Sequence, residues 1–297
     1  MVRKTTFKPL THSADEAGPG IDARSARILL PALTANRMAE ETMLNQIKKM
    51  LRRFPPAYRF AGGVYRTLVR PVLMRFQHGR EFAAWRGAGR LVPPTPSAEE
   101  QRHEIAAWQE AGRPVPPPPS VKQAVVAAYG ERFGMRTLVE TGTYLGQMVE
   151  AQRGRFDRVW SIELDKGLAS TARDRFANAK NVTILQGDSG EHLKDVLAAS
   201  NGRCLFWLDA HYSAGITARG DTDTPIRSEL ELVLTAPWEH VVLIDDARCF
   251  GAADFPDYPS IDEIRSIVAQ HRTDWAVTVQ DDIIRIHSGA PWTPPSP

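Results

Sequence analysis

The chain has 297 residues, of which 42% are hydrophobic and 24% charged, with a formal net charge of +2. This balance indicates a soluble globular protein with a large core, and the net charge alone favours no class of partner. The distribution of charge is uneven: residues 46–90 hold eleven lysines and arginines against one acid, Glu81.

Several classes are excluded by what the sequence lacks. The two cysteines, Cys204 and Cys249, sit in apolar surroundings and do not form a disulfide framework. No apolar run approaches the roughly 20 residues that span a bilayer. The start, "MVRKTTFKPLTHSADEAG", has no apolar core of a secretory signal, so a cytoplasmic location is expected.

The first 119 residues divide into two parts by pattern. Residues 1–42 are weakly patterned and are predicted to be a tail of low order, whereas 43–119 read as a basic helical extension. In "MLNQIKKMLRRF" (43–54) the apolar residues share one helical face and the basic residues lie elsewhere on the wheel. Such a helix either packs on protein, including a second copy in a homo-oligomer, or makes a peripheral membrane contact. Packing on protein is the favoured alternative.

An internal repeat occupies part of this extension. "REFAAWRGAGRLVPPTPS" (80–97) returns as "HEIAAWQEAGRPVPPPPS" (103–120), with 12 of 18 positions identical. Each copy predicts a short helix stopped by glycine and followed by an extended proline segment. Two copies are too few for a solenoid, so a local duplication that covers the domain or a partner is expected.

From residue 120 to about 290 the sequence alternates between short apolar runs and helical stretches. The predicted strands are 136–141, 158–164, 181–187, 203–210 and 240–246, with helices around Met148, Ala172, Leu193 and Leu230. This alternation predicts an α/β fold with a doubly wound, Rossmann-like sheet. "WAVTVQDDIIRIH" predicts a C-terminal antiparallel hairpin that turns at Asp281–Asp282, giving seven strands.

The ends of the first three strands predict a site for an adenosine-bearing cofactor. "VETGTYLG" places Glu140, Thr141, Gly142 and Gly146 after strand one, where glycine lets the backbone approach a ligand. Carboxylates also stand at the next two strand ends. Glu163 lies 21 residues after Gly142, the spacing at which a carboxylate usually accepts from the ribose hydroxyls of a nucleotide. Asp188 could accept from an adenine amino group.

Glu140 favours S-adenosylmethionine over a dinucleotide such as NAD as the cofactor. A dinucleotide's pyrophosphate would be held by the helix N-terminus that follows strand one, and a carboxylate there would repel it. The ammonium and sulfonium groups of S-adenosylmethionine carry positive charge and suit Glu140 better than NAD does.

The fourth and fifth strands are expected to be neighbours, about 5 Å apart. Asp209 then meets Asp245 and Asp246 at the edge of the cofactor cleft, where it would serve both cofactor and acceptor. Three close carboxylates favour a hard divalent cation such as Mg²⁺ or Mn²⁺. The alternative for Asp245 and Asp246 is that they only cap the next turn.

His211 follows Asp209 by two residues and would suit a general base better than a hard-metal ligand. A purely local hydrogen bond is an equal alternative, and Tyr212 and Ser213 are weaker candidates for the base. The polar stretch 213–225 has the composition of a lid, and Arg248 is available to an anionic acceptor. Trp207 is predicted to lie in the core, and His240 at the opposite end of the sheet.

At these residues the chain resembles the class I S-adenosylmethionine-dependent methyltransferases over roughly residues 120–288. "VETGTYLG" is similar to the first motif of the metal-dependent O-methyltransferases of the catechol and caffeoyl-coenzyme A type. "LDAH" and "IDD" match that family's metal-binding positions at Asp209, Asp245 and Asp246, and the macrolide-sugar O-methyltransferases are another similar group. One departure is that the lysine base of the catechol type is replaced here by Tyr212.

The resemblance implies methyl transfer from S-adenosylmethionine to an oxygen of a small molecule or sugar, assisted by a divalent metal. The alternatives are an enzyme that uses NAD or a nucleotide sugar, or a protein whose basic N-terminal third binds membrane or nucleic acid beside a degenerate domain. The intact carboxylate set argues against degeneracy, so a nucleic-acid partner is not expected.

Overall fold

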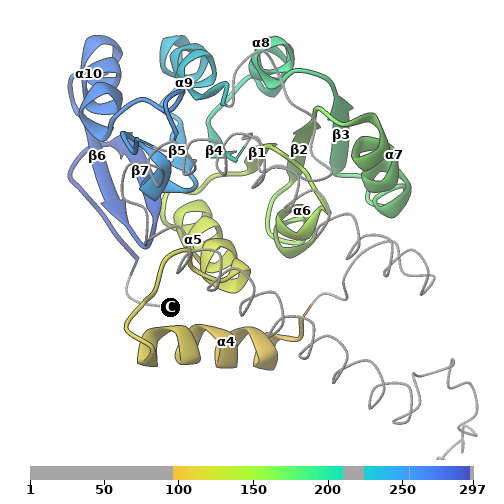
Figure 1. Ribbon diagram of the computed structural model, residues 1–297. Helices are drawn as coiled ribbons and strands as arrows, with labels where there is room; N and C mark the ends of the chain where they lie inside the picture. The colour runs from red at the N-terminus through yellow and green to blue at the C-terminus, as the bar shows by residue number, and fades with distance from the viewer. Residues whose placement is uncertain (1–95, 210–223, 254, 295–297) are drawn as a thin grey trace, which may run out of the picture. The chain divides into compact units, whose positions relative to one another are not determined.

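The computed structural model describes residues 96–209, 224–253 and 255–294. Within them, one seven-stranded sheet has the order β3-β2-β1-β4-β5-β7-β6 (Figure 1). β1 to β5 run parallel, and β7 is antiparallel to both β5 and β6. The strands are Thr137–Thr141 (β1), Arg158–Glu163 (β2), Val182–Gln186 (β3), Cys204–Leu208 (β4), Val241–Ile244 (β5), Trp275–Gln280 (β6) and Ile283–Ser288 (β7). The predicted doubly wound sheet with a terminal hairpin is confirmed.

The sheet reverses its direction of growth at β1. The chain moves outward from β1 to β2 and β3, then returns to place β4 on the other side of β1. Ligands of open α/β sheets bind at such a switch point, outside the carboxyl ends of the strands. In the register, Leu208 of β4 lies beside both Thr141 of β1 and Ile244 of β5. The predicted neighbourhood of the fourth and fifth strands is therefore confirmed.

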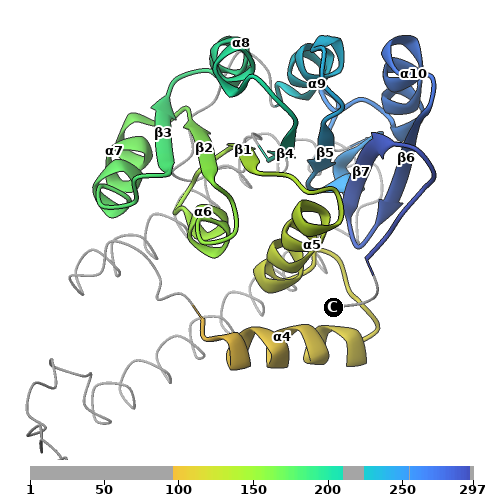
Figure 2. The same ribbon diagram turned by 180° about the vertical axis from the view of Figure 1, so that it is seen from behind.

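Helices cover both faces of the sheet (Figures 1 and 2). Those on one face are α5 (Pro119–Arg132), α6 (Gln147–Gln152) and α7 (Lys166–Arg175), and those on the other are α8 (Ser189–Ser200), α9 (Ile226–Thr235) and α10 (Ile261–His271). Neighbouring strand residues alternate between the two cores: Leu138 packs with α5 to α7, and Val139 packs with α8 to α10.

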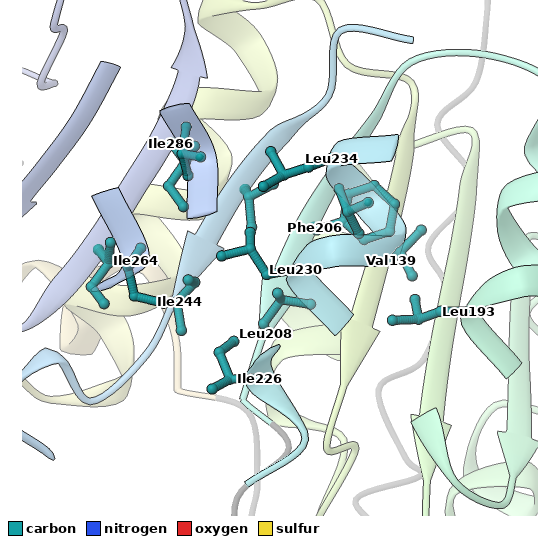
Figure 3. Close-up of a cluster of buried hydrophobic side chains, with 14 of the residues drawn as sticks. Val139, Leu193, Phe206, Leu208, Ile226, Leu230, Leu234, Ile244, Ile264 and Ile286 are labelled. Carbon is teal, nitrogen blue, oxygen red and sulfur yellow. The ribbon is translucent and has the colours of Figure 1, made fainter. Parts of the chain in front are cut away.

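The core beneath α8 to α10 explains why the parallel strands read as continuous apolar runs. Phe206, Leu208 and Ile244 point from the sheet toward Leu193 and Leu230 of the helices (Figure 3). All five residues of β4 are buried because each face of the sheet is covered. The predicted burial of Trp207, which is 1% exposed, is confirmed on the α5 to α7 side.

The terminal hairpin turns as its sequence predicts. Asp281 and Asp282 have φ of 52° and 62°, the left-handed pair that a tight two-residue hairpin turn requires and that aspartate tolerates. Asp282 then accepts a hydrogen bond from the backbone N–H of Arg248 at 2.7 Å. The turn is thereby tied to the segment after β5, next to the candidate site.

The second repeat copy has the predicted form. Its helix, α4 (Ala98–Glu110), is followed by Gly112 with φ of 82° and by the proline segment that leads into α5. Trp108 is buried, and its indole N–H donates to the carbonyl of Pro114 at 2.8 Å. The first copy up to residue 95, the tail 1–42 and the helix predicted at 43–54 lie outside the described residues.

Helix α10 was not among the predicted elements. Its signal is a capping box in which Ser260 and Glu263 satisfy each other's backbone N–H groups. None of the helices that the structure describes is long and apolar enough to cross a membrane.

His240, predicted at the far end of the sheet, lies just before β5. Its Nδ1 accepts a hydrogen bond from the N–H of Cys204 at 3.1 Å, and its ring packs edge-on against Phe206. Burial, followed by the charges of Arg272 and Arg203, lowers the pKa of His240 to about 4. The folded protein therefore holds this imidazole neutral, with Nδ1 as the acceptor.

Stability should consequently fall as the pH drops from about 6.5 toward 4. In this window the imidazole of the unfolded chain takes up a proton and that of the folded chain does not, which lowers the free energy of unfolding by about 2 kcal/mol between pH 7 and pH 5. Urea unfolding at the two pH values measures the effect in wild type and in His240→Gln, whose side chain does not titrate. An equal pH dependence in both proteins would contradict the assignment.

Candidate functional site

The loop between β1 and α6 has a backbone shape that depends on two glycines. Gly142 and Gly146 have φ of 89° and 71°, and an added Cβ on Gly146 would come within 2.8 Å of the Phe176 ring. Both glycines therefore keep the loop close to the ends of β1 and β2. The N–H of Gly142 donates to the carbonyl of Ile162 at 2.9 Å, which fixes the loop against β2.

Glu140 is buried at the centre of the sheet edge, 2% exposed. Its carboxyl accepts a hydrogen bond from the Ser161 hydroxyl, whose oxygen lies 2.5 Å from the hydroxyl of Thr143. Burial raises the pKa of Glu140 to about 8, opposed by the Ser161 hydrogen bond and reinforced by the charges of Asp209 and Glu163. A cationic group placed beside Glu140 would favour its ionised form.

Glu163 closes β2 and links two loops at the sheet edge. Its two carboxylate oxygens accept from the N–H of Tyr144 at 2.8 Å and the N–H of Asp165 at 2.9 Å. Burial raises the pKa of Glu163, and these backbone hydrogen bonds oppose the shift. Each oxygen keeps a second lone pair, so the same carboxylate can accept further hydrogen bonds from a bound hydroxyl.

Asp188 stands exposed after β3 and caps α8, accepting from the N–H of Glu191 at 3.2 Å. Capping uses one oxygen, Oδ1, and leaves Asp188 at the same sheet edge as Glu140 and Glu163. The three carboxyl groups predicted for the cofactor thus stand at the ends of β1, β2 and β3, which are adjacent in the sheet.

Glu229, on the first turn of α9, is a buried carboxyl that was not predicted. Burial raises the pKa of Glu229 to about 7, opposed by the hydroxyls of Ser189 and Thr141. Sequence reasoning missed Glu229 because "IRSELELVL" reads as an amphipathic helix with its acids in water.

A second cluster of acids lies at the ends of β4 and β5. The N–H of Asp209 donates to the carbonyl of Thr141 at 3.0 Å. Burial raises the pKa of Asp245, the charge of Asp209 adds to this rise, and the charge of Lys122 opposes it. The predicted convergence of these acids at one edge is therefore present in the fold.

Lysine and arginine side chains already contact this cluster. Lys122 Nζ, from the first turn of α5, donates a short hydrogen bond to Asp245 and lies 3.7 Å from Asp246 Oδ1. Arg248 Nη1 donates to Asp246 at 2.7 Å and also pairs with Asp282. Arg248, predicted to receive an anionic acceptor, is thus held by two carboxylates.

The described side chains do not fit a divalent ion bound by Asp209, Asp245 and Asp246 together. The ammonium of Lys122 already contacts a carboxylate oxygen of Asp245, and a divalent ion bound to the same carboxylate would be repelled by it. Across residues 96–209, 224–253 and 255–294, no three His, Cys, Asp or Glu side chains are grouped to hold a metal. The divalent cation remains a prediction that this arrangement does not support.

The predicted base and lid lie in a part of the chain that the structure leaves undescribed. His211, Tyr212 and Ser213, with the lid up to residue 223, fall between the described residues Asp209 and Thr224. Their roles remain predictions.

No protein-family model matches the chain. The chain is 39% identical to ribosomal RNA small subunit methyltransferase A of Acidobacterium capsulatum over 66 residues. This stretch is 22% of this chain and 23% of that protein. Over 64 residues it is 34% identical to the probable ribosomal RNA small subunit methyltransferase A of Methanosarcina mazei, 22% of this chain and 24% of that protein. The chain therefore spans less than a quarter of the length of these curated relatives.

Two solved structures illustrate the structural similarity. The O-methyltransferase TomG from Streptomyces achromogenes, solved with S-adenosylmethionine, is 17% identical, with a TM-score of 0.41 over 66% of this chain and 92% of that one. The O-methyltransferase from Bacillus cereus, solved with S-adenosylhomocysteine, is 14% identical, with a TM-score of 0.42 over 65% and 92%.

Proposed function

We propose that this chain, which has the seven-stranded sheet and terminal hairpin of the class I S-adenosylmethionine-dependent methyltransferases, transfers a methyl group from that cofactor. The observation that carries the proposal is the set of carboxyl groups of Glu140, Glu163 and Asp188 at three adjacent strand ends, beside a glycine loop in the left-handed conformation. The methyltransferase names of the curated relatives support the same reaction.

Each strand end has a proposed role in binding the cofactor. Glu163 would accept from the ribose hydroxyls and Asp188 from the adenine amino group, while Thr141, Gly142 and Gly146 shape the loop beside the amino acid part. Glu140 would face the positive end of the cofactor, where its ionised form is favoured by the ammonium and sulfonium charges. Asp209, at the switch point between β1 and β4, would border both cofactor and acceptor.

The acceptor is proposed to be a hydroxyl of a small molecule or a sugar. Its oxygen attacks the methyl carbon in line with the departing sulfur, so that a carbon–oxygen bond forms as the carbon–sulfur bond breaks. The cofactor supplies this methyl as an electrophile on a positively charged sulfur. The hydroxyl proton passes to a base, for which His211 is proposed, and S-adenosylhomocysteine is released. The divalent ion that the sequence predicts takes no part in this proposal.

RNA is a second candidate acceptor. It is favoured by the ribosomal RNA methyltransferase names of the two curated relatives, and by the eleven basic residues against one acid in 46–90. Against it stands the short length of those matches, about 22% of this chain each.

Calorimetric titration tests the cofactor directly. We expect S-adenosylmethionine and S-adenosylhomocysteine to bind with one site per chain, and NAD and a nucleotide sugar not to bind. Saturable NAD binding without S-adenosylmethionine binding would overturn the proposal. Transfer of a labelled methyl group to a panel of sugars and small hydroxyl compounds, with ribosomal RNA in parallel, then separates the two acceptor classes.

A further inference from the structure

Lys122 reaches the acidic cluster from a helix that precedes the whole sheet in the chain. It lies on the first turn of α5, and packing of this helix on the sheet brings its side chain to the carboxyl ends of β4 and β5. The Lys122 side chain is 19% exposed, and those of Asp245 and Asp246 are 1% and 8% exposed. The ammonium is therefore largely withdrawn from water and is held against carboxylates.

The charges at this edge are arranged around that ammonium. Lys122 contacts Asp245 directly and lies 3.7 Å from Asp246, and the charge of Asp209 also acts on it. Arg248 pairs with both Asp246 and Asp282. Each acid of the "IDD" segment is consequently matched by a side-chain cation of the same chain.

A divalent ion would compete with Lys122 for the same oxygens. Magnesium and manganese coordinate carboxylate oxygens at about 2 Å, and the Lys122 nitrogen already stands at hydrogen-bonding distance from Asp245. The ion would have to expel the ammonium from a largely buried position.

We propose that Lys122 is the resident cation of this site, in the place of the divalent metal ion that the Asp209, Asp245 and Asp246 pattern predicts. Lys122 acts as a positioning residue: it holds Asp245 and Asp246 together beside Asp209 at the acceptor side of the cleft. Methyl transfer by this chain then needs no divalent ion. This last consequence rests on the proposed function, whereas the assignment of the cation does not.

Manganese titration followed by electron paramagnetic resonance tests the assignment on the full-length wild-type chain. We expect the signal of free Mn²⁺ to match that of a protein-free solution up to millimolar concentration. Stoichiometric loss of free Mn²⁺ that disappears in Asp245→Asn would overturn the proposal. This measurement needs neither cofactor nor acceptor, so its result stands even if the chain proves to transfer no methyl group.

Substitution of Lys122 gives the complementary result. Lys122→Met keeps the length of the side chain but removes the ammonium, so the acids lose their cation and we expect Mn²⁺ binding to appear. Lys122→Arg should bind no Mn²⁺, as in wild type, because the guanidinium restores the charge. Lys180→Met, which removes an exposed lysine far along the chain, is the control for net charge. Mn²⁺ binding that is equally absent in Lys122→Met and wild type would count against the proposal. If Lys122→Met does not fold, the titrations of wild type and Lys122→Arg decide.

A turnover assay tests whether methyl transfer by this chain needs a divalent ion. With an acceptor in hand, the wild-type rate should be unchanged by excess chelator and by added Mg²⁺. A rate that falls tenfold or more in chelator and recovers with Mg²⁺ would overturn metal independence, while cofactor binding measured in the same samples reports whether the proposed function holds.

Discussion

Glu163→Ala should weaken S-adenosylmethionine binding by about tenfold to hundredfold. Hydrogen bonds to a charged acceptor contribute about 1.5–3 kcal/mol, and each 1.4 kcal/mol changes the dissociation constant tenfold. The substitution removes the proposed acceptor for the ribose hydroxyls. It also leaves the N–H groups of Tyr144 and Asp165 without their carboxylate partner. Titration calorimetry measures the dissociation constant, and thermal unfolding of the unliganded protein reports the structural part of the effect.

A matched control separates cofactor contact from loss of charge. Asp157→Asn removes one acid just before β2, at the opposite end of the strand from Glu163, where Asp157 pairs with Arg136 on the surface. We expect its cofactor affinity to match that of wild type. If Glu163→Ala binds S-adenosylmethionine as tightly as Asp157→Asn does, Glu163 is not the ribose contact.

The strand ends could be predicted from sequence because two simple regularities determine them. Apolar runs flanked by helical stretches give parallel strands, and parallel strands place their carboxyl ends at one edge. Glu140, Glu163 and Asp188 therefore fall at adjacent strand ends, as predicted. The hairpin turn at Asp281–Asp282 could also be predicted from the sequence, because aspartate tolerates the left-handed backbone of a short turn.

The partners of those residues could not be predicted in the same way. Lys122 lies 123 residues before Asp245 and meets it only because α5 packs across the sheet. In "SVKQAVV" a single lysine on a helix reads as a solvated side chain, and its neighbours give no hint of a buried acid. Glu229 is similar: its burial depends on α9 covering Thr141 and Ser189, a tertiary contact that the helical pattern does not specify.

The predicted metal site depends on charges that the local sequence around Asp209, Asp245 and Asp246 does not specify. Three acids at neighbouring strand ends favour a nearby positive charge, and from the sequence a bound divalent ion is the expected source of that charge. In the fold, Lys122 contacts Asp245 and Arg248 contacts Asp246. The divalent cation stays a prediction, and the cations that the structure shows at these acids are side chains brought in by tertiary packing.

Asp209→Asn should reduce the rate of methyl transfer by about hundredfold or more while changing cofactor affinity much less. Asp209 follows β4 at the switch point, beside Thr141, and its charge acts on both Glu140 and Lys122. Asparagine has the same shape, so the loss isolates the charge that we propose for orienting the acceptor hydroxyl and its base. Well-placed acid–base groups contribute about 10²–10⁴ in rate, which sets the expected size.

The rate constant for methyl transfer and the dissociation constant of S-adenosylmethionine should be measured on the same Asp209→Asn preparation. Asp195→Asn, on the exposed side of α8, removes an equal charge away from the strand ends and should leave both constants unchanged. A wild-type rate in Asp209→Asn would remove Asp209 from the catalytic machinery. A large loss of affinity with a normal rate at saturation would instead place Asp209 against the cofactor, and the acceptor would then have to be oriented by residues beyond it, among them His211.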